Sequence, residues 1–310
     1  MGQKLLKRLR RNSLMKIMKK FKISSINYTN PDDVTLYRIC AVSSFVTASG
    51  DRVSKGEFGG WIEKESNLSQ EGNCWVFDDA KVFGDAFVRG DAIVKGNAKV
   101  FGSAEIKDNA VISGNADIFG VARIYQNAQV CGLAKVFGSV LIKGNALITG
   151  RAKVRGDGVI IGGNAILSGD TETYGSKFQI YESVFFEDAI VKSIDDFFSL
   201  GPIDGLSITL FRTANNEIRI GEFATCSYYD FEKFMSLGKM SPLFKEIFQK
   251  VYSVFVEYVL QDIFAPCPIC RGRVNNDPDA STIHCLHCGC SAPKESWRKI
   301  AVLSKKDFMV

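Results

Sequence analysis

Apolar and polar positions follow a six-residue pattern that runs without interruption from residue 72 to residue 161. Each hexad reads Gly-(Asn/Asp)-Ala-x-(Val/Ile)-x. A small residue, once replaced by Val140, recurs from Cys74 to Gly158, and a β-branched residue recurs from Val76 to Ile160. An α-helix would repeat its apolar face every 3.6 residues. The pattern therefore predicts short strands separated by Gly-Asn or Gly-Asp corners, where a positive φ costs little.

Three hexads can close one turn of a triangular coil whose Ala and Val/Ile side chains point inward. Stacked turns then bury a continuous core that no single turn could bury alone. The fifteen hexads predict five turns, a column of roughly 24 Å at about 4.8 Å per stacked strand. The pattern slips by one residue at Gly162-Gly163, which predicts that the column ends near residue 170.

This repeat resembles that of the hexapeptide-repeat left-handed β-helix superfamily. Four segments are similar to one bacterial and prophage-borne group within it, often labelled transferases: Leu-Tyr-Arg-Ile at 36–39, Lys-Gly-Glu-Phe-Gly-Gly-Trp-Ile-Glu at 55–63, Asn-Leu-Ser at 67–69 and Gly-Asn-Cys-Trp-Val at 72–76. The likeness covers about residues 34 to 165. It implies a mainly β fold with a single-stranded left-handed parallel β-helix over residues 62–170.

Residues before the repeat are expected to cap the column, because an open β-helix end exposes unpaired backbone. Residues 34 to 42 alternate as a strand would, and a glycine-rich turn leads into Trp61 and Leu68, which continue the inward phase backwards. The cap is therefore predicted at residues 23–61, after a basic tail at residues 1–22.

Residues 171–264 predict a small α+β and helical module. A hairpin is expected from residues 207–212 and 217–223, with a turn at Asn215-Asn216. A short helix is expected from Ser227, with Asp230 as the acid of a capping box. A longer amphipathic helix is expected from Pro242 to Phe264, with an aromatic face that packs on its own protein or on a second copy.

Two CxxC pairs near the C-terminus, separated by fourteen residues, predict a zinc ribbon over residues 265–310. Four thiolates would complete the tetrahedral shell of one structural Zn²⁺ and leave no open position for catalysis. The ligands are expected to be Cys267, Cys270, Cys285 and Cys288. Cys290, His284 and His287 are alternative donors. The segment also resembles the zinc ribbons of prophage restriction-alleviation proteins, which implies a phage-linked, host-modulating role such as counter-defence.

Residues eighteen positions apart should stack on one face of the column. Two such rows lie side by side, one of phenylalanines and one mostly of lysines interrupted by Asp117. The predicted binding surface, called the Lys–Phe face below, consists of Lys81, Phe83, Lys99, Phe101, Phe119, Lys135, Phe137 and Lys153. It could hold a nucleic-acid strand or an acidic protein surface. It could equally be a self-stabilising ring stack beside solvated lysines.

Charge is distributed unevenly along the chain. The net charge is +5, yet residues 1–22 hold nine of the 39 Lys and Arg and no acid, so the remainder has 30 basic against 34 acidic residues. The tail could be a disordered segment or a basic amphipathic helix for nucleic acid or anionic lipid.

No apolar run reaches the ~20 residues of a membrane span. Two CxxC pairs in a chain with no signal peptide favour a reducing cytoplasm.

These observations favour a non-catalytic protein that binds a protein partner through a rigid column and a zinc ribbon. Nucleic-acid binding through the tail and the ribbon is one alternative, and assembly as a dimer or trimer is compatible with either. Acyl or acetyl transfer is the other alternative, implied by the resemblance. Those enzymes resemble one another in a histidine general base projected from a coil, whereas both histidines of this chain lie in the predicted ribbon.

Overall fold

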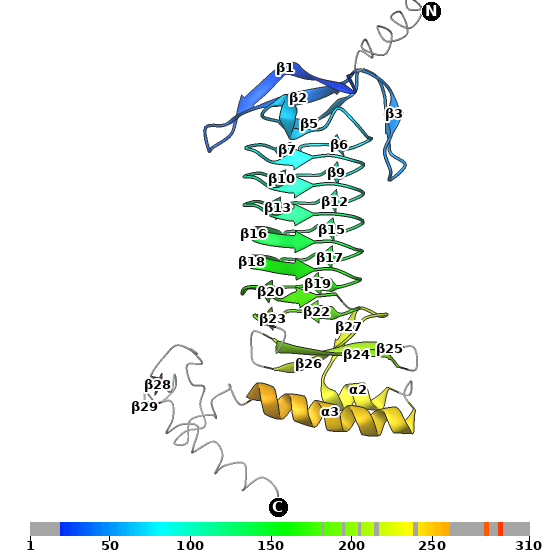
Figure 1. Ribbon diagram of the computed structural model, residues 1–310, viewed down its shortest axis with the longest axis vertical. Coiled ribbons are helices and arrows are strands. Elements are labelled where there is room, and N and C mark those ends of the chain that lie inside the picture. The colour runs from blue at the N-terminus through cyan, green and yellow to red at the C-terminus, as the bar shows by residue number, and fades with distance from the viewer. Residues whose placement is uncertain are drawn as a thin grey trace, which may run out of the picture.

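The chain forms a tall column of stacked turns, closed at one end by an N-terminal sheet and at the other by a small sheet with two helices (Figure 1). This architecture comes from a computed structural model. It describes residues 19–181, 183–193, 196–203, 206–213, 217–237, 241–260, 282–284 and 291–293.

Short parallel strands build the column, as the hexads predict. They are β6 (Trp75–Val76), β7 (Lys81–Val82), β8 (Phe87–Val88), β9 (Ile93–Val94), β10 (Lys99–Val100), β11 (Glu105–Ile106), β12 (Val111–Ile112), β13 (Asp117–Ile118), β14 (Arg123–Ile124), β15 (Gln129–Val130), β16 (Lys135–Ile142), β17 (Leu147–Ile148) and β18 (Lys153–Ile161). Every third strand pairs in parallel register, for example β7 with β10 and β10 with β13. The column therefore has three sides per turn, as predicted.

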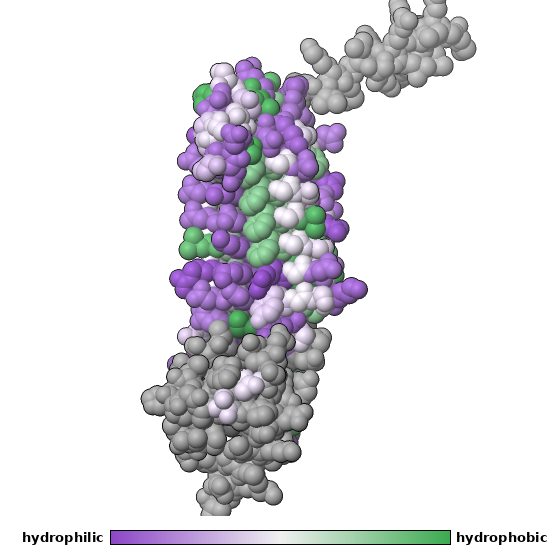
Figure 2. Space-filling view, turned by 90° about the vertical axis from the view of Figure 1, so that its left-hand side faces the viewer, coloured by the Kyte–Doolittle hydropathy of each residue, from purple (hydrophilic) through white to green (hydrophobic). Residues whose placement is uncertain are grey.

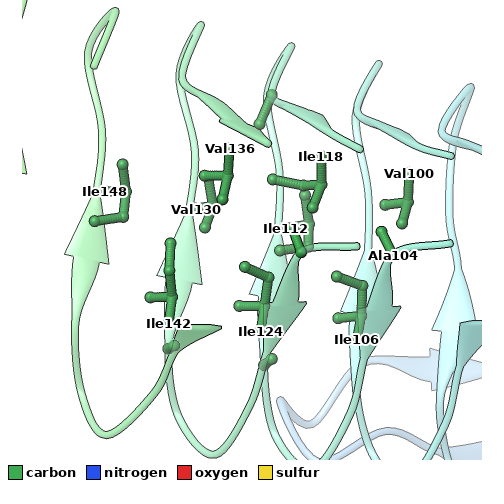
Figure 3. Close-up of a cluster of buried hydrophobic side chains, with 14 of the residues drawn as sticks. Val100, Ala104, Ile106, Ile112, Ile118, Ile124, Val130, Val136, Ile142 and Ile148 are labelled. Atoms are coloured by element: carbon green, nitrogen blue, oxygen red, sulfur yellow. The ribbon is translucent and has the colours of Figure 1, made fainter. Parts of the chain in front are cut away.

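The interior is a ladder of small and β-branched side chains. Every predicted inward residue from Cys74 to Val154 is at most 1 % exposed. Figure 3 shows Ile106, Ile124 and Ile142 stacked on one side of this interior, on successive turns. The hexad pattern thus predicts the core residue by residue as far as Val154.

The extra residue of the repeat lies earlier than the sequence suggests. Strand β18 pairs with β16 in register up to Asp157, then slips by one residue, so that Val159 and Ile161 point inward. The predicted inward positions Gly158 and Ile160 are therefore wrong. Gly158 has a φ of +72° and takes up the inserted residue in a left-handed conformation that suits glycine.

The column also continues beyond its predicted end near residue 170. Parallel pairing extends through β19 (Ile166–Ser168), β20 (Glu172–Thr173), β21 (Gln179–Ile180), β22 (Phe185–Glu187) and β23 (Ile190–Val191). The column thus has about seven turns rather than five. Its last turns bury Thr171, Thr173, Phe178 and Phe186 in place of alanine and valine, which hides them from a hexad search.

The N-terminal cap is antiparallel. It contains β1 (Phe21–Thr29), β2 (Thr35–Ala41) and β5 (Phe58–Ile62), and β5 then pairs in parallel with β7. The short strands β3 (Phe45–Val46) and β4 (Arg52–Val53) form a hairpin, and a 3-10 turn, η1, spans Glu65–Asn67. Leu68 is buried as predicted, but the buried large side chain of β5 is Ile62, whereas Trp61 is only partly buried.

The C-terminal cap is a four-stranded antiparallel sheet covered by helices. Its strands are β24 (Phe197–Ile203), β25 (Leu206–Arg212), β26 (Ile218–Glu222) and β27 (Ser227–Tyr229). The predicted hairpin is confirmed in β25 and β26. Ser227 begins a strand, not a helix. Helix α2 (Phe231–Ser236) begins after Asp230, whose carboxylate is itself the N-cap and accepts from the Lys233 amide at 2.7 Å.

Helix α3 (Pro242–Leu260) packs its aromatic face on this sheet, since Phe244, Phe248 and Phe255 are buried with Ile208 and Ile220. Beyond it the structure describes one hairpin, β28 (Thr282–His284) with β29 (Ser291–Pro293). Among the described helices, none has the length and apolar character needed to cross a membrane.

Candidate binding face

The phenylalanine row of the Lys–Phe face forms a continuous ring stack. Successive ring centroids of Phe83, Phe101, Phe119 and Phe137 are 5.0, 4.9 and 4.8 Å apart, and successive ring planes differ by 3°, 9° and 3°. On the side seen in Figure 2 an apolar stripe runs down the column beside hydrophilic side chains. Because the row is stacked, the inner rings of Phe101 and Phe119 each have a ring neighbour on both sides. The predicted ladder is confirmed.

The lysine row is also in register. Lys81, Lys99, Asp117, Lys135 and Lys153 occupy equivalent positions on successive strands of one side. The acid Glu172 on β20 follows in the same row.

The two ends of this row differ in how their charges are compensated. Lys135 Nζ lies 3.9 Å from the Asp117 carboxylate, and Lys153 Nζ lies 2.5 Å from Glu172. Among the described residues, Lys81 Nζ donates to the backbone oxygen of Asp79 at 2.9 Å and lies 6.0 Å from the centroid of the Tyr28 ring, and Lys99 has no ion-pair partner. The positive charge is thus least compensated nearest the N-terminal cap.

A groove of about 520 Å³ follows the lysine row. It is lined by Lys81, Asn97, Lys99, Asn115, Asp117, Leu133, Lys135, Arg151 and Lys153. Arg151 is held by two hydrogen bonds of 2.6 Å to Asp170. The groove therefore brings together all four lysines of the predicted binding surface, with amides from the neighbouring corner.

A second hollow, of about 660 Å³, continues from the first toward the N-terminal cap, and the two share Lys81 and Lys99. Its aromatic wall is Tyr28, Trp61 and Phe83. The Tyr28 and Trp61 rings meet edge to face, with centroids 4.7 Å apart. The Tyr28 hydroxyl is buried and has no hydrogen-bond partner.

Charged groups around this second hollow are partly engaged already. Asp79 accepts from the Trp61 indole at 3.3 Å and lies 3.6 Å from the Arg38 guanidinium, which also covers the Trp61 ring. Burial lowers the pKa of Lys81, against the opposing effect of Asp79. The sequence repeat does not reveal this end of the groove, because Tyr28 and Trp61 are 33 positions apart and meet only through the cap.

A separate polar cluster lies on the side built from β8, β11 and β14. The Glu105 carboxylate accepts from both Arg89 and the Tyr125 hydroxyl, and Lys107 Nζ lies 3.9 Å above the Tyr125 ring. Burial and the Glu105 hydrogen bond raise the pKa of Tyr125 to about 12. Burial acts to raise the pKa of Glu105, but the hydrogen bonds that it accepts from Tyr125 and Arg89 lower that pKa below its ordinary value. The sequence pattern gave no indication of this cluster.

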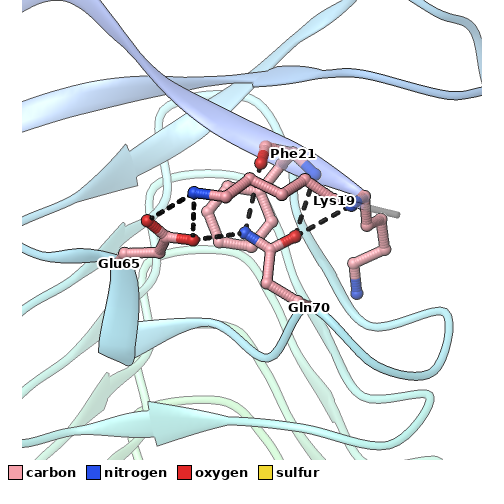
Figure 4. A network of polar contacts seen from close by, with 5 residues as sticks. Lys19, Phe21, Glu65 and Gln70 are labelled. Atoms are coloured by element: carbon pink, nitrogen blue, oxygen red, sulfur yellow. Dashed lines mark hydrogen bonds and ion pairs between the residues drawn. The ribbon is translucent and has the colours of Figure 1, made fainter. Parts of the chain in front are cut away.

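The N-terminal strand is tied to the column by polar contacts. Lys19 Nζ lies 3.0 Å from Glu65, and the Gln70 amide bonds both Glu65 and the Phe21 backbone (Figure 4). The buried Lys20 donates to the Cys74 backbone oxygen at 2.9 Å, and its pKa is lowered by burial. These contacts anchor β1 and have a structural role.

Two other rows run along the column. The corner row is an amide ladder, in which Asn109 donates to Asn127 and Asn127 to Asn145, each at 3.1 Å. An apolar row begins at Trp75 and continues at Ile93 on the next turn. The N-terminal cap covers Trp75, whose ring centroid lies 5.3 Å from that of Phe45. In Figure 1 the helices lie below the column.

The predicted zinc ligands Cys267, Cys270, Cys285 and Cys288 lie outside the described residues, as do Cys290 and the side chains of His284 and His287. The hairpin of β28 and β29 brackets the chain segment that holds the second CxxC pair. Within the described part of the chain, no group of three or more His, Cys, Asp or Glu side chains could hold a metal ion.

The chain shares a short likeness with a curated protein. The chain is 42% identical over 50 residues to a protein of Escherichia coli (strain K12) named "Uncharacterized acetyltransferase YdcK". The match covers 16% of this chain and 14% of that protein. No family model matches the chain. The likeness supports a hexapeptide-repeat type of β-solenoid and covers too little of either protein to carry an activity across.

Proposed function

We propose that this chain is a non-catalytic binding protein whose Lys–Phe face engages an acidic surface of a protein partner. The observation that carries the proposal is the groove that follows four in-register lysines beside a rigid ring stack. A repeat column holds such a row at fixed spacing without the entropy loss of ordering a loop, which favours recognition.

Two features favour a protein partner over a nucleic acid at this face. Base stacking on aromatic rings contributes about 1–3 kcal/mol per base to single-strand binding and needs open ring faces. Here the faces of Phe101 and Phe119 are turned to neighbouring rings. In addition, Asp117 interrupts the lysine row and would oppose a uniformly charged backbone.

The test is affinity purification from bacteria with a tagged wild-type chain and a variant that loses the four lysines. The variant carries Lys81→Gln, Lys99→Gln, Lys135→Gln and Lys153→Gln. A matched control removes four exposed cations elsewhere, with Lys22→Gln, Arg52→Gln, Lys55→Gln and Arg123→Gln. We expect the partner to be captured by the wild type and the control and lost from the face variant. Equal capture by all three would refute the proposal.

A second candidate function is acetyl transfer, and the likeness to the uncharacterized acetyltransferase supports it. The comparison favours this candidate, whereas the chemistry of the column does not, because the column sequence contains no histidine to act as a general base. The decisive assay measures release of free coenzyme A from acetyl-CoA by the purified full chain. Coenzyme A release that depends on an added acceptor amine, with formation of the acetylated amine in equal amount, would establish the enzyme and displace the binding function.

Three finer expectations belong to this proposal. We propose a left-handed coil, on the strength of the hexapeptide-repeat resemblance. We propose one structural Zn²⁺ at the two CxxC pairs, because four thiolates at this spacing suit a closed tetrahedral shell. The phage-linked, host-modulating role and the cytoplasmic location stay predictions from the sequence.

A further inference from the structure

Recognition by the Lys–Phe face is concentrated at one end of the groove. We infer that the pair Lys81 and Lys99 receives the carboxylates of an acidic, extended peptide segment, and that an apolar side chain of the same segment fills the hollow lined by Tyr28, Trp61 and Phe83. This inference rests on the proposed function and specifies which residues determine recognition. It treats the rest of the lysine row as structural.

Unpaired positive charge is distributed unevenly along the lysine row. Lys135 is paired with Asp117 and Lys153 with Glu172, so an incoming carboxylate would have to compete with an existing partner at either site. Lys81 and Lys99 are neighbours on β7 and β10, and no described carboxylate forms an ion pair with either of them. Two ammonium groups held side by side gain most from an added anion, since their mutual repulsion is relieved at the same time.

Neutral hydrogen-bonding side chains lie at the same place. Asn97 and Asn115 line the groove beside Lys99. Amide donors can satisfy the carboxylate lone pairs that the lysines leave open. A carboxylate at this point therefore finds both charge and hydrogen-bond donors without displacing a contact of the protein.

The neighbouring hollow fixes the direction of the peptide. Its wall is aromatic, and its carboxylates oppose a second anion: Asp32 lines it from the cap, and Asp79 lies beside Trp61. An apolar side chain therefore suits the part of this hollow formed by Tyr28, Trp61 and Phe83 better than a second carboxylate does.

The spacing of the two lysines also suits an extended peptide. Alternate residues of an extended peptide lie about 6.8 Å apart on one face, and neighbouring turns of the column are about 4.8 Å apart. The flexible four-carbon stems of two lysines easily span that difference. Farther along the row the next side chain is Asp117, which opposes continued negative charge. The face thus suits a short acidic motif rather than a uniform polyanion.

The probe is a fluorescein-labelled peptide containing Phe-Gly-Glu-Ser-Glu between glycine–serine flanks, titrated by fluorescence anisotropy. Three full-length proteins are compared: wild type, Lys81→Gln/Lys99→Gln, and the matched pair Lys135→Gln/Lys153→Gln. We expect the first pair of substitutions to weaken binding about tenfold or more and the second pair less than about threefold, because charge-assisted hydrogen bonds to unpaired lysines are the stronger ones. Replacing the probe's phenylalanine with glycine should also weaken binding to the wild type.

A labelled ten-nucleotide oligothymidine of higher charge serves as the uniform polyanion. We expect it to bind more weakly than the peptide and to gain affinity in an Asp117→Asn variant. The inference is overturned if the peptide shows no saturable binding at about 1 mM, if both lysine pairs lose affinity equally, or if the oligonucleotide binds the wild type more tightly.

Failure of this inference and failure of the proposed function give different results. Equal peptide losses for the two pairs, together with loss of the captured partner from the four-lysine variant, would overturn the inference and leave the proposed function standing. Undiminished capture by the four-lysine variant would overturn the proposed function itself.

Discussion

Truncation of one inward side chain tests the packing of the column most simply. Ile124 is fully buried between Ile106 and Ile142 of the adjacent turns. We expect Ile124→Ala to leave a cavity that the rigid ladder cannot collapse, because the backbone of each turn is hydrogen-bonded to the turns on both sides. Such substitutions destabilise proteins by about 2–5 kcal/mol, and this site should lie in the upper half of that range.

Val121 provides the matched control, since it lies one corner away and is 50 % exposed. Val121→Ala should change the free energy of unfolding by less than about 0.5 kcal/mol. Equilibrium urea unfolding, followed by far-UV circular dichroism, measures both variants, and the denaturant slope reports whether the column still unfolds cooperatively. A loss below about 1 kcal/mol for Ile124→Ala, or an equal loss for the two variants, would refute the inward assignment.

Three further predictions concern the outer face, the pH response and the metal. Phe101→Ala should destabilise the column by about 1–3 kcal/mol in the same assay, because it removes two stacking contacts of about 0.5–1.5 kcal/mol each; no loss would mean that the ring stack adds nothing. The pKa of Tyr125 is raised to about 12 from 10, so its contribution to stability is fully present below pH 10 and lost as the pH rises through 12. Urea unfolding at stepped pH should show a larger loss in the wild type than in Tyr125→Phe, which keeps the raised pKa values of Tyr28 and Tyr252, and equal curves would contradict it. Elemental analysis should find one zinc per chain, lost in Cys267→Ser and retained in a control Cys226→Ser, which changes an exposed free cysteine; zinc retained by both would exclude Cys267 as a required ligand.

The regular part of the fold could be predicted from the sequence because one rule governs each residue there. Six-residue spacing fixes both the inward side chains and the stacked outer rows, so the ring ladder follows by counting in steps of eighteen. The rule fails where an inserted residue can be absorbed at several glycines. The sequence offers Gly156, Gly158, Gly162 and Gly163 close together, and only three-dimensional pairing shows which one takes the insertion.

The last turns and the end of the groove could not be predicted for a different reason. Inward threonines look polar in a sequence, yet Thr171 is buried and its hydroxyl accepts from the Ala189 amide at 3.2 Å. Tyr28 and Trp61 are brought together by the antiparallel cap, whose register follows no repeat. The lysine row was visible in the sequence, but its uneven compensation depends on which side chains reach a carboxylate.

The central claim, that the Lys–Phe face is the contact surface, is tested most directly by lysine footprinting of the captured complex. The tagged chain, alone and with its partner, is acetylated briefly with a hydroxysuccinimide ester, and the modification of each lysine is quantified by mass spectrometry. We predict strong protection of Lys81 and Lys99 in the complex, with exposed Lys22 and Lys55 unchanged. Protection of Lys22 and Lys55 instead, or equal modification of the face with and without the partner, would contradict the account.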